Sequence, residues 1–332
     1  MRLATYNVEW FNGLFNDEDQ VVADGGRSAR YGVTRAQQAQ AIAQVLRALD
    51  ADGLMIVEAP DHSHRRNAVV AMERFARFAG LRANTALIGF ANDTQQEIVF
   101  LYDPLILSAR HAPVQGTEQV PAFNQSFRID LDIDAEADTV VFSKPPFEVD
   151  VQVGGRRLHL IGAHLKSKAP HGARTRDAVM RQSIANRRKQ LAQAIWLRRR
   201  VEQDLAAGAS LIVMGDLNDG PGLDEYEDLF GRSSVEIILG DDPALFDPHA
   251  AQALQRRLGA APTTARFFLK QEKRYLQALL DYIMVSPDLM AQSPEWRIWH
   301  PFDDPQCWQD LPLREALLTA SDHFPVTLDL KF

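Results

Sequence analysis

Short runs in which apolar and polar residues alternate recur along the whole chain. Alternation with a period of two is typical of strands that are buried on one face. The clearest cases are VDVQV at 149–153 and VTLDL at 326–330. Together with short apolar runs, the pattern predicts strands at residues 3–8, 54–58, 98–102, 147–153, 158–164, 211–214, 282–285 and 326–330.

Helical spacing of apolar residues appears between these runs. Thr34 and Gln37 form a candidate capping box at the start of a predicted helix over 34–50. Regular alternation of strands and helices is not sustained beyond residue 100, so we expect an α/β fold with mixed, largely antiparallel sheets. No linker or internal repeat divides the chain, which favours a single domain over 1–332. Further helices are predicted over 66–79, 177–205 and 223–230.

Composition excludes several classes of protein. The chain has 332 residues, 46% of them hydrophobic and 24% charged, which is ordinary for a globular protein. Its single cysteine, Cys307, rules out a disulfide framework and a zinc site built from several cysteines. The N-terminal residues lack the apolar core of a signal peptide, and no apolar run reaches the ~18 residues of a membrane span. We therefore expect a cytoplasmic protein without a membrane span, with a monomer as the default.

Charge is distributed unevenly. The net charge is −8, yet the segment 156–200 holds thirteen Lys and Arg against one acidic residue, Asp177. A basic block inside an acidic protein points to a local site for an anion rather than to a generally adhesive surface.

Polar residues stand where several predicted strands meet turns. A single Asp or Asn at such a position usually serves the turn itself. A set of acids, amides and imidazoles at many strand ends is instead typical of a site built on a rigid scaffold. The set comprises Asn7, Glu58, His164, Asp216, Asn218, Asp281, Asp322 and His323.

The residue types in this set suit one kind of chemistry. Carboxylate and amide oxygens without cysteine favour a hard cation such as Mg²⁺ or Mn²⁺. Histidine, lysine and asparagine hold phosphoryl oxygens, and a histidine paired with an aspartate orients water or supports a charged transition state. Metal-assisted hydrolysis of a phosphate ester uses all of these parts.

The order of these residues resembles the endonuclease/exonuclease/phosphatase superfamily, to which DNase I belongs. The resemblance extends over residues 5–326 and depends most on GDLN at 215–218 and SDH at 321–323. It implies a four-layer α/β sandwich, in which two mainly antiparallel sheets pack face to face and are flanked by helices. Val57 departs from the family, since many members have Gln before the metal-binding Glu. HLKSK at 164–168 resembles bacterial nuclease-like branches more than abasic-site endonucleases.

The resemblance also implies a role for each residue of the set. Glu58 would be the principal Mg²⁺ ligand, with Asn7 beside it and Asp322 as a further ligand. Asp216 would orient or deprotonate the attacking water, and Asn218 would hold a phosphate oxygen. The remaining catalytic residues would be His323, which contacts the phosphate, Asp281, which positions His323, and His164, which stabilises the phosphorane or the leaving oxygen.

Basic residues beside this set are candidates for phosphate binding. Lys166 and Lys168 alternate onto one face after the strand that ends at His164. Arg174 and Arg176 lie in a basic loop that either clamps a second phosphate or is a surface loop.

Further along, the predicted helix over 177–205 places its apolar residues inward and its arginines outward. Arg187 and Arg188 fall near the inward stripe, and one of them is expected to brace the site from behind. The run Arg198–Arg200 is expected to form a solvated face. Aromatic residues next to basic ones at 266–282 would stack bases in a nuclease, but we expect Phe267 and Phe268 to be core.

The leading hypothesis is a Mg²⁺-dependent phosphodiesterase, with Mn²⁺ as a substitute and a nuclease acting on nucleic acid as the favoured activity. The alternative is a phosphatase or phosphodiesterase for a small-molecule or lipid phosphate. A non-catalytic binding protein on the same scaffold is disfavoured because every proposed ligand and catalytic group is present. The chain has no G-x-S-x-G motif and no P-loop, which excludes serine hydrolases and P-loop NTPases of the usual kind.

Overall fold

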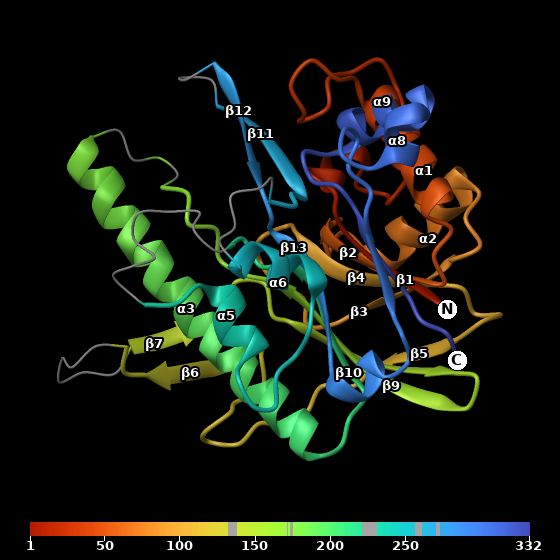
Figure 1. Cartoon of the computed structure of the whole chain (residues 1–332). Helices are drawn as coiled ribbons and strands as arrows, with labels where there is room; N and C mark the ends of the chain where they lie inside the picture. Colours follow the sequence, from red (N-terminus) through yellow and green to blue (C-terminus); the bar gives the residue numbers. More distant parts are fainter. Residues whose placement is uncertain (132–137, 171, 173–174, 221–230, 256–260, 270–272) are drawn as a thin grey trace.

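The computed structural model describes residues 1–131, 138–170, 172, 175–220, 231–255, 261–269 and 273–332 (Figure 1). Two main sheets carry the fold. The first has six strands in the order β14-β15-β1-β2-β4-β3, and all neighbours except β1 and β2 are antiparallel. Its strands are β1 (Arg2–Asn7), β2 (Gly53–Ala59), β3 (Thr85–Ile88), β4 (Glu97–Tyr102), β14 (Glu295–Ile298) and β15 (Val326–Asp329).

The second sheet has five strands in the order β13-β10-β9-β8-β5, and its one parallel pair is β9 with β10. Two separate hairpins, β6–β7 and β11–β12, complete the described strands. The sheet strands are β5 (Ser108–His111), β8 (Phe147–Val153), β9 (Arg156–His164), β10 (Leu211–Asp216) and β13 (Asp281–Val285); the hairpins are β6 (Ser126–Ile129), β7 (Asp138–Val141), β11 (Ala265–Leu269) and β12 (Arg274–Ala278).

The two sheets pack against each other through a buried apolar layer that includes Leu3, Phe100, Val149, Leu160 and Ile283. Helices cover both outer faces, so the chain forms the four-layer α/β sandwich that the resemblance implies (Figure 1). On the six-stranded sheet lie α1 (Arg35–Leu49), α2 (Ala68–Ala79) and α9 (Leu311–Ala320), with η1 (Phe11–Leu14) and α8 (Pro305–Gln309) nearby. On the five-stranded sheet lie α3 (Arg176–Ala206), α5 (Ser234–Leu239) and α6 (Pro248–Leu254), and α7 (Pro287–Met290) follows β13.

All eight predicted strands are present, with ends shifted by at most two residues. The seven described strands that were missed, β3, β5, β6, β7, β11, β12 and β14, are four or five residues long. Such short strands lie at sheet edges or in hairpins and bury too few side chains to produce a clear alternation. Among the described residues, no helix combines the length and the apolar character that a bilayer crossing requires.

The predicted helices at 34–50, 66–79 and 177–205 are confirmed, and the one at 223–230 lies outside the described residues. The capping box is also present, because Thr34 Oγ1 accepts a hydrogen bond from the Gln37 backbone N–H at 3.2 Å. The described helices at residues 234–239, 248–254, 287–290, 305–309 and 311–320 were not predicted; apart from the last, they are seven residues or shorter.

The prediction that the arginines of α3 point outward is wrong for Arg198 and Arg200, which are 7% and 0% exposed. Arg187, which was expected near the inward stripe, is buried at 1% exposed. Arg200 forms a fully buried ion pair with Glu148 at 3.2 Å, and Arg198 donates to the backbone carbonyl oxygens of Leu239 and Pro243. Arginines that are buried with acceptors cannot be told from solvent-exposed arginines by their sequence positions alone.

Candidate active site

The two parallel strand pairs bring distant parts of the chain to one edge of the sandwich. Parallel strands end at the same edge, and the register places Asn7 beside Val57 in one sheet and Asp216 beside His164 in the other. β13 runs antiparallel to β10 and begins at this edge, so Asp281 lies opposite Asp216. The eight residues of the predicted set therefore converge from both sheets.

Asp216 lies at this edge, and both of its carboxylate oxygens accept hydrogen bonds. Asn7 Nδ2 donates to its Oδ2 at 2.9 Å, and the Asn218 backbone N–H donates to its Oδ1 at 2.7 Å. Asn218 Nδ2 lies 3.1 Å from Asp216 Oδ2 and 3.1 Å from the Leu165 carbonyl oxygen, so both of its amide hydrogens have protein partners. Burial raises the pKa of Asp216 to about 7, while the nearby charge of His323 opposes the shift.

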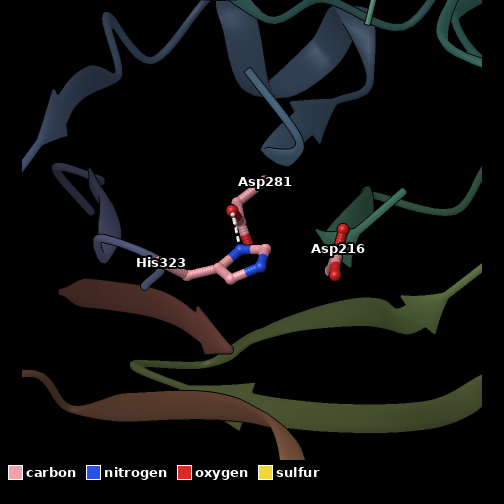
Figure 2. Close-up of side chains that lie close together, drawn as sticks. All are labelled: Asp216, Asp281 and His323. Carbon is pink, nitrogen blue, oxygen red and sulfur yellow. Dashed lines mark hydrogen bonds and ion pairs between the residues drawn. The ribbon is translucent and has the colours of Figure 1, made fainter. Parts of the chain in front are cut away.

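His323 forms a buried pair with Asp281. Its Nδ1 lies 2.7 Å from Asp281 Oδ2, and Figure 2 shows the pair beside Asp216. Burial alone would lower the pKa of His323, but the charge and hydrogen bond of Asp281, with the charges of Asp216 and Asp322, raise it well above its usual value. His323 is therefore a cation at neutral pH.

His164 has the opposite protonation state. Burial lowers its pKa well below the usual value, and the charges of Lys144 and His323 add to the effect. Its Nε2 lies 3.6 Å from Asp216 Oδ2. The site thus holds one cationic and one neutral imidazole, an arrangement that allows the two rings to do different work.

Lys144 is the site residue that sequence reasoning missed. Its Nζ lies 3.4 Å from His164 Nε2, and the charges of Glu58 and Asp216 act on it. Burial is the main cause that lowers its pKa. Lys144 follows the apolar run TVVF, so it is also a polar residue at a strand end, but β7 is a short hairpin strand that was not predicted.

Oxygen atoms at the same edge fit a metal ion. Asn7 Oδ1 is buried and has no hydrogen-bond donor among the described residues. Burial raises the pKa of Asp322 to about 6, and the charges of Glu9 and Glu58 act in the same direction. Glu58 is held at a β-bulge with a φ of 60°. Neighbouring carboxylates with a buried amide oxygen that has no donor are the environment that a divalent cation balances.

A second group also has ligand geometry. One ligand atom each from Asp216, Asp281 and His323 lie within 4.8 Å of one another, so this buried group could hold a metal ion. In the described structure, however, His323 Nδ1 and Asp281 Oδ2 are bonded to each other. Asn7, Glu58 and Asp322 offer only oxygen atoms, whereas this group also offers a ring nitrogen.

The four predicted phosphate-binding residues have surroundings that differ from one to the next. Lys166 is half-buried, and its charge is close enough to act on Lys144. Lys168 Nζ donates to the buried Asp219 Oδ1 at 2.7 Å. Arg176 is the exposed first residue of α3, and Arg174 lies outside the described residues. A phosphate-binding role for these four residues stays a prediction.

Asp219 joins Lys168 to the arginine that was expected to brace the site. Arg187 Nη1 donates to Asp219 Oδ2 at 2.8 Å, and the Ser234 N–H donates to the same oxygen at 2.7 Å. Gln190 donates to the backbone carbonyls of Lys166 and Asn218. This buried layer supports the loops that carry the site from the side of α3. The other arginine of that prediction, Arg188, pairs with Asp138 instead.

Two further outcomes concern the aromatic residues of β11. Phe267 is half-buried and its ring centroid lies 5.6 Å from that of His323. Phe268 is 51% exposed, so the prediction that it is core is wrong. The two neighbours point to opposite faces of the hairpin, as successive strand residues do.

A buried acid, two histidines with opposite pKa shifts, a lysine and several carboxylate and amide oxygens are groups that suit the hydrolysis of a phosphoric ester. The chain belongs to the endonuclease/exonuclease/phosphatase family, whose model matches residues 4–323. No curated protein matches the sequence.

Solved structures share the fold at low sequence identity. Truncated TDP2 from Caenorhabditis elegans has a TM-score of 0.52 and 15% identity, with 98% of this chain and 96% of that chain covered. D. rerio TDP2 in complex with a single-strand DNA product has a TM-score of 0.50 and 13% identity, covering 100% and 99%. A mannosyl-6-phosphatase of Bacteroides thetaiotaomicron has a TM-score of 0.49 and 16% identity, covering 100% of both chains.

Proposed function

We propose that this phosphoesterase is a Mg²⁺-dependent phosphodiesterase that cleaves nucleic acid, with Mn²⁺ as a substitute. The observation that carries the proposal is the position of Asp216 between His323 and His164, with its pKa near neutrality. A carboxylate of this kind is matched to accepting a proton from water at physiological pH. The cationic His323 and Lys144 lie where a phosphoryl group would need positive charge.

Each residue of the site has its own role in the proposed reaction. Asp216 orients the attacking water and takes its proton, while Asn7 and Asn218 fix the direction of its carboxylate. His323, held by Asp281, donates a hydrogen bond to a non-bridging phosphate oxygen. His164 and Lys144 stabilise the charge that develops as the P–O bond to the leaving oxygen breaks.

A divalent cation would be held by Glu58, Asn7 and Asp322. When bound, it would act as a Lewis acid on a phosphoryl oxygen. The donor set is made only of oxygen, which agrees with Mg²⁺ rather than with zinc.

Nucleic acid is proposed as the substrate because part of the basic block at 156–200 lies at the edge that carries the site. Lys166 and Lys168 follow β9 at this edge, and burial together with the charge of Lys166 lowers the pKa of Lys189. A polyanion gains from several such contacts, whereas a small phosphate needs only those at the reacting group. A relative with this fold, TDP2 of D. rerio, was solved with a single-strand DNA product, which supports testing DNA first.

Glu58→Gln is expected to weaken Mg²⁺ binding by at least ~10-fold, because it removes a ligand charge at constant shape. Isothermal titration calorimetry with Mg²⁺ measures this directly. The matched control is Glu295→Gln, since Glu295 is exposed and pairs with Lys331. Equal Mg²⁺ affinity in wild type and Glu58→Gln would place the metal elsewhere.

Lys144→Ala is expected to lower kcat on phosphodiesters by ~10²-fold, since removing one preorganised donor for the transition state has an effect of that order. Lys144→Arg should retain part of the rate because it keeps the charge. Lys331→Ala, which removes an exposed lysine, is the control. A Lys144→Ala rate within twofold of wild type would remove Lys144 from the mechanism.

A further inference from the structure

The hairpin β11–β12 exposes an unusual group of aromatic side chains. Phe268 and Tyr275 are each 51% exposed, and Phe302, which precedes α8, is 37% exposed. Phe268 and Tyr275 are directly opposite each other in the hairpin register. Figure 1 shows the hairpin standing out from the sandwich. A group of adjacent large aromatic rings exposed to water is typical of an interaction site, whereas single exposed rings are common.

An arginine organises these rings. The Arg266 guanidinium carbon lies 3.7 Å from the centroid of the Tyr275 ring and 4.9 Å from that of Phe302. The Phe268 and Tyr275 centroids are 5.1 Å apart with their planes tilted. The result is a series of ring and guanidinium groups, which we call the hairpin surface: Phe268, Tyr275, Arg266 and Phe302.

The charge of the hairpin favours an anionic occupant. Its described segments, 261–269 and 273–280, contain Arg266, Lys273 and Arg274 and no acidic residue, in a chain whose net charge is −8. Exposed aromatic faces next to arginine and lysine are the combination that binds single-stranded nucleic acid, because bases stack on the rings while the phosphates meet the cations.

The base of the hairpin is bonded to the candidate active site. Ala265 forms a β-bridge with His323, and the Arg266 N–H donates to the Asp322 carbonyl oxygen at 2.7 Å. Thr264 Oγ1 accepts from the Asp281 backbone N–H at 2.9 Å. Phe267, on the opposite face of the strand, packs on the His323 ring. The hairpin surface lies on the other face of β11 from Phe267, and the hairpin that carries it is fixed to the site through backbone contacts at its base.

We propose that the hairpin surface binds a single-stranded segment of the polynucleotide next to the scissile phosphate. Bases stack on Phe268 and Tyr275, and Arg266 and Lys273 take the neighbouring phosphates. A single strand is specified because the bases of a duplex are paired and stacked on each other, which leaves their faces unavailable to the rings. This inference rests on the proposed function and names the form of its substrate.

The test compares wild type with the double variant Phe268→Ala/Tyr275→Ala in the full chain. Affinity for a fluorescently labelled single-stranded oligonucleotide is measured by anisotropy, with Asp216→Ala added to both proteins to prevent cleavage. Loss of two stacking platforms should raise Kd by at least ~10-fold. In proteins that retain Asp216, kcat/KM should fall at least ~5-fold more on the oligonucleotide than on bis-p-nitrophenyl phosphate.

Matched controls separate stacking from general damage. Phe332→Ala removes another exposed aromatic ring that carries a stacked arginine, Arg156 at 4.9 Å, and should leave oligonucleotide binding as in wild type. Lys273→Ala should lower the slope of log Kd against log salt by about 1. Circular dichroism confirms that each variant is folded.

The failures of the two proposals are distinguishable. If wild type cleaves the oligonucleotide and the double variant binds it as tightly as wild type does, the hairpin surface is not the binding site and the proposed function stands. Equal losses for single-stranded and duplex DNA would contradict the preference for a single strand. If wild type hydrolyses only bis-p-nitrophenyl phosphate and binds no oligonucleotide, nucleic acid is the wrong substrate and both proposals fail.

Discussion

Asp216→Ala is expected to lower phosphodiester turnover by at least ~10³-fold while the protein remains folded. Asp216 is the buried acid that faces His164 and that two asparagines hold in place. Burial raises its pKa to about 7, and these hydrogen bonds fix the orientation of its carboxylate. Steady-state hydrolysis of bis-p-nitrophenyl phosphate with Mg²⁺, together with circular dichroism, measures the rate and the fold.

Asp241→Ala is the matched control, because Asp241 is an exposed aspartate whose partner is the exposed Arg232. Its turnover should equal that of wild type. An Asp216→Ala protein that kept most of its activity would show that another group activates the water.

Asp219→Asn is expected to lower the free energy of unfolding by ~3–5 kcal/mol, because it leaves a buried cation without its counter-charge. The side chains of Asp219 and Arg187 are 0% and 1% exposed, and the carboxylate also holds Lys168 and the Ser234 N–H. Urea unfolding followed by circular dichroism measures the loss. Asp241→Asn, which breaks an exposed pair, should change stability by at most ~1 kcal/mol.

The pH dependence of the same pair has a definite sign. Burial opposes ionisation of Asp219, but Lys168 and Arg187 outweigh it and lower the pKa below its ordinary value of 3.8. The stabilisation is therefore fully present above pH 3.8 and is lost as the pH falls through the lowered pKa. The stability difference between wild type and Asp219→Asn should shrink under those acidic conditions, and a difference that stayed constant would contradict the ion-pair explanation.

The long central strands were predictable from the sequence, whereas the short edge strands were not. β8 and β9 are seven and nine residues long and are largely buried, so their apolar residues form runs or alternations that stand out. β7 and β12 are four and five residues long, each buries one residue, and both are too short to show a clear alternation. Their position depends on hairpin partners and not on local pattern.

The same contrast explains which site residues were found. Asn7, His164 and Asp216 follow strong strands, so their placement at strand ends could be seen directly. Lys144 follows β7 and was missed for the reason that β7 was missed. The burial of Arg200 depends on Glu148 in a distant strand, and a single sequence gives no sign of that pairing.

The central claim, that the chain is a metal-dependent nuclease, is tested most directly by one hydrolysis panel. Supercoiled plasmid, single-stranded DNA, RNA, bis-p-nitrophenyl phosphate and p-nitrophenyl phosphate are each incubated with Mg²⁺, Mn²⁺ or EDTA, with Asp216→Ala in parallel. We predict cleavage of a polynucleotide with Mg²⁺ or Mn²⁺, and none with EDTA or with Asp216→Ala. Turnover of p-nitrophenyl phosphate alone, or polynucleotide cleavage that persists in EDTA, would contradict it.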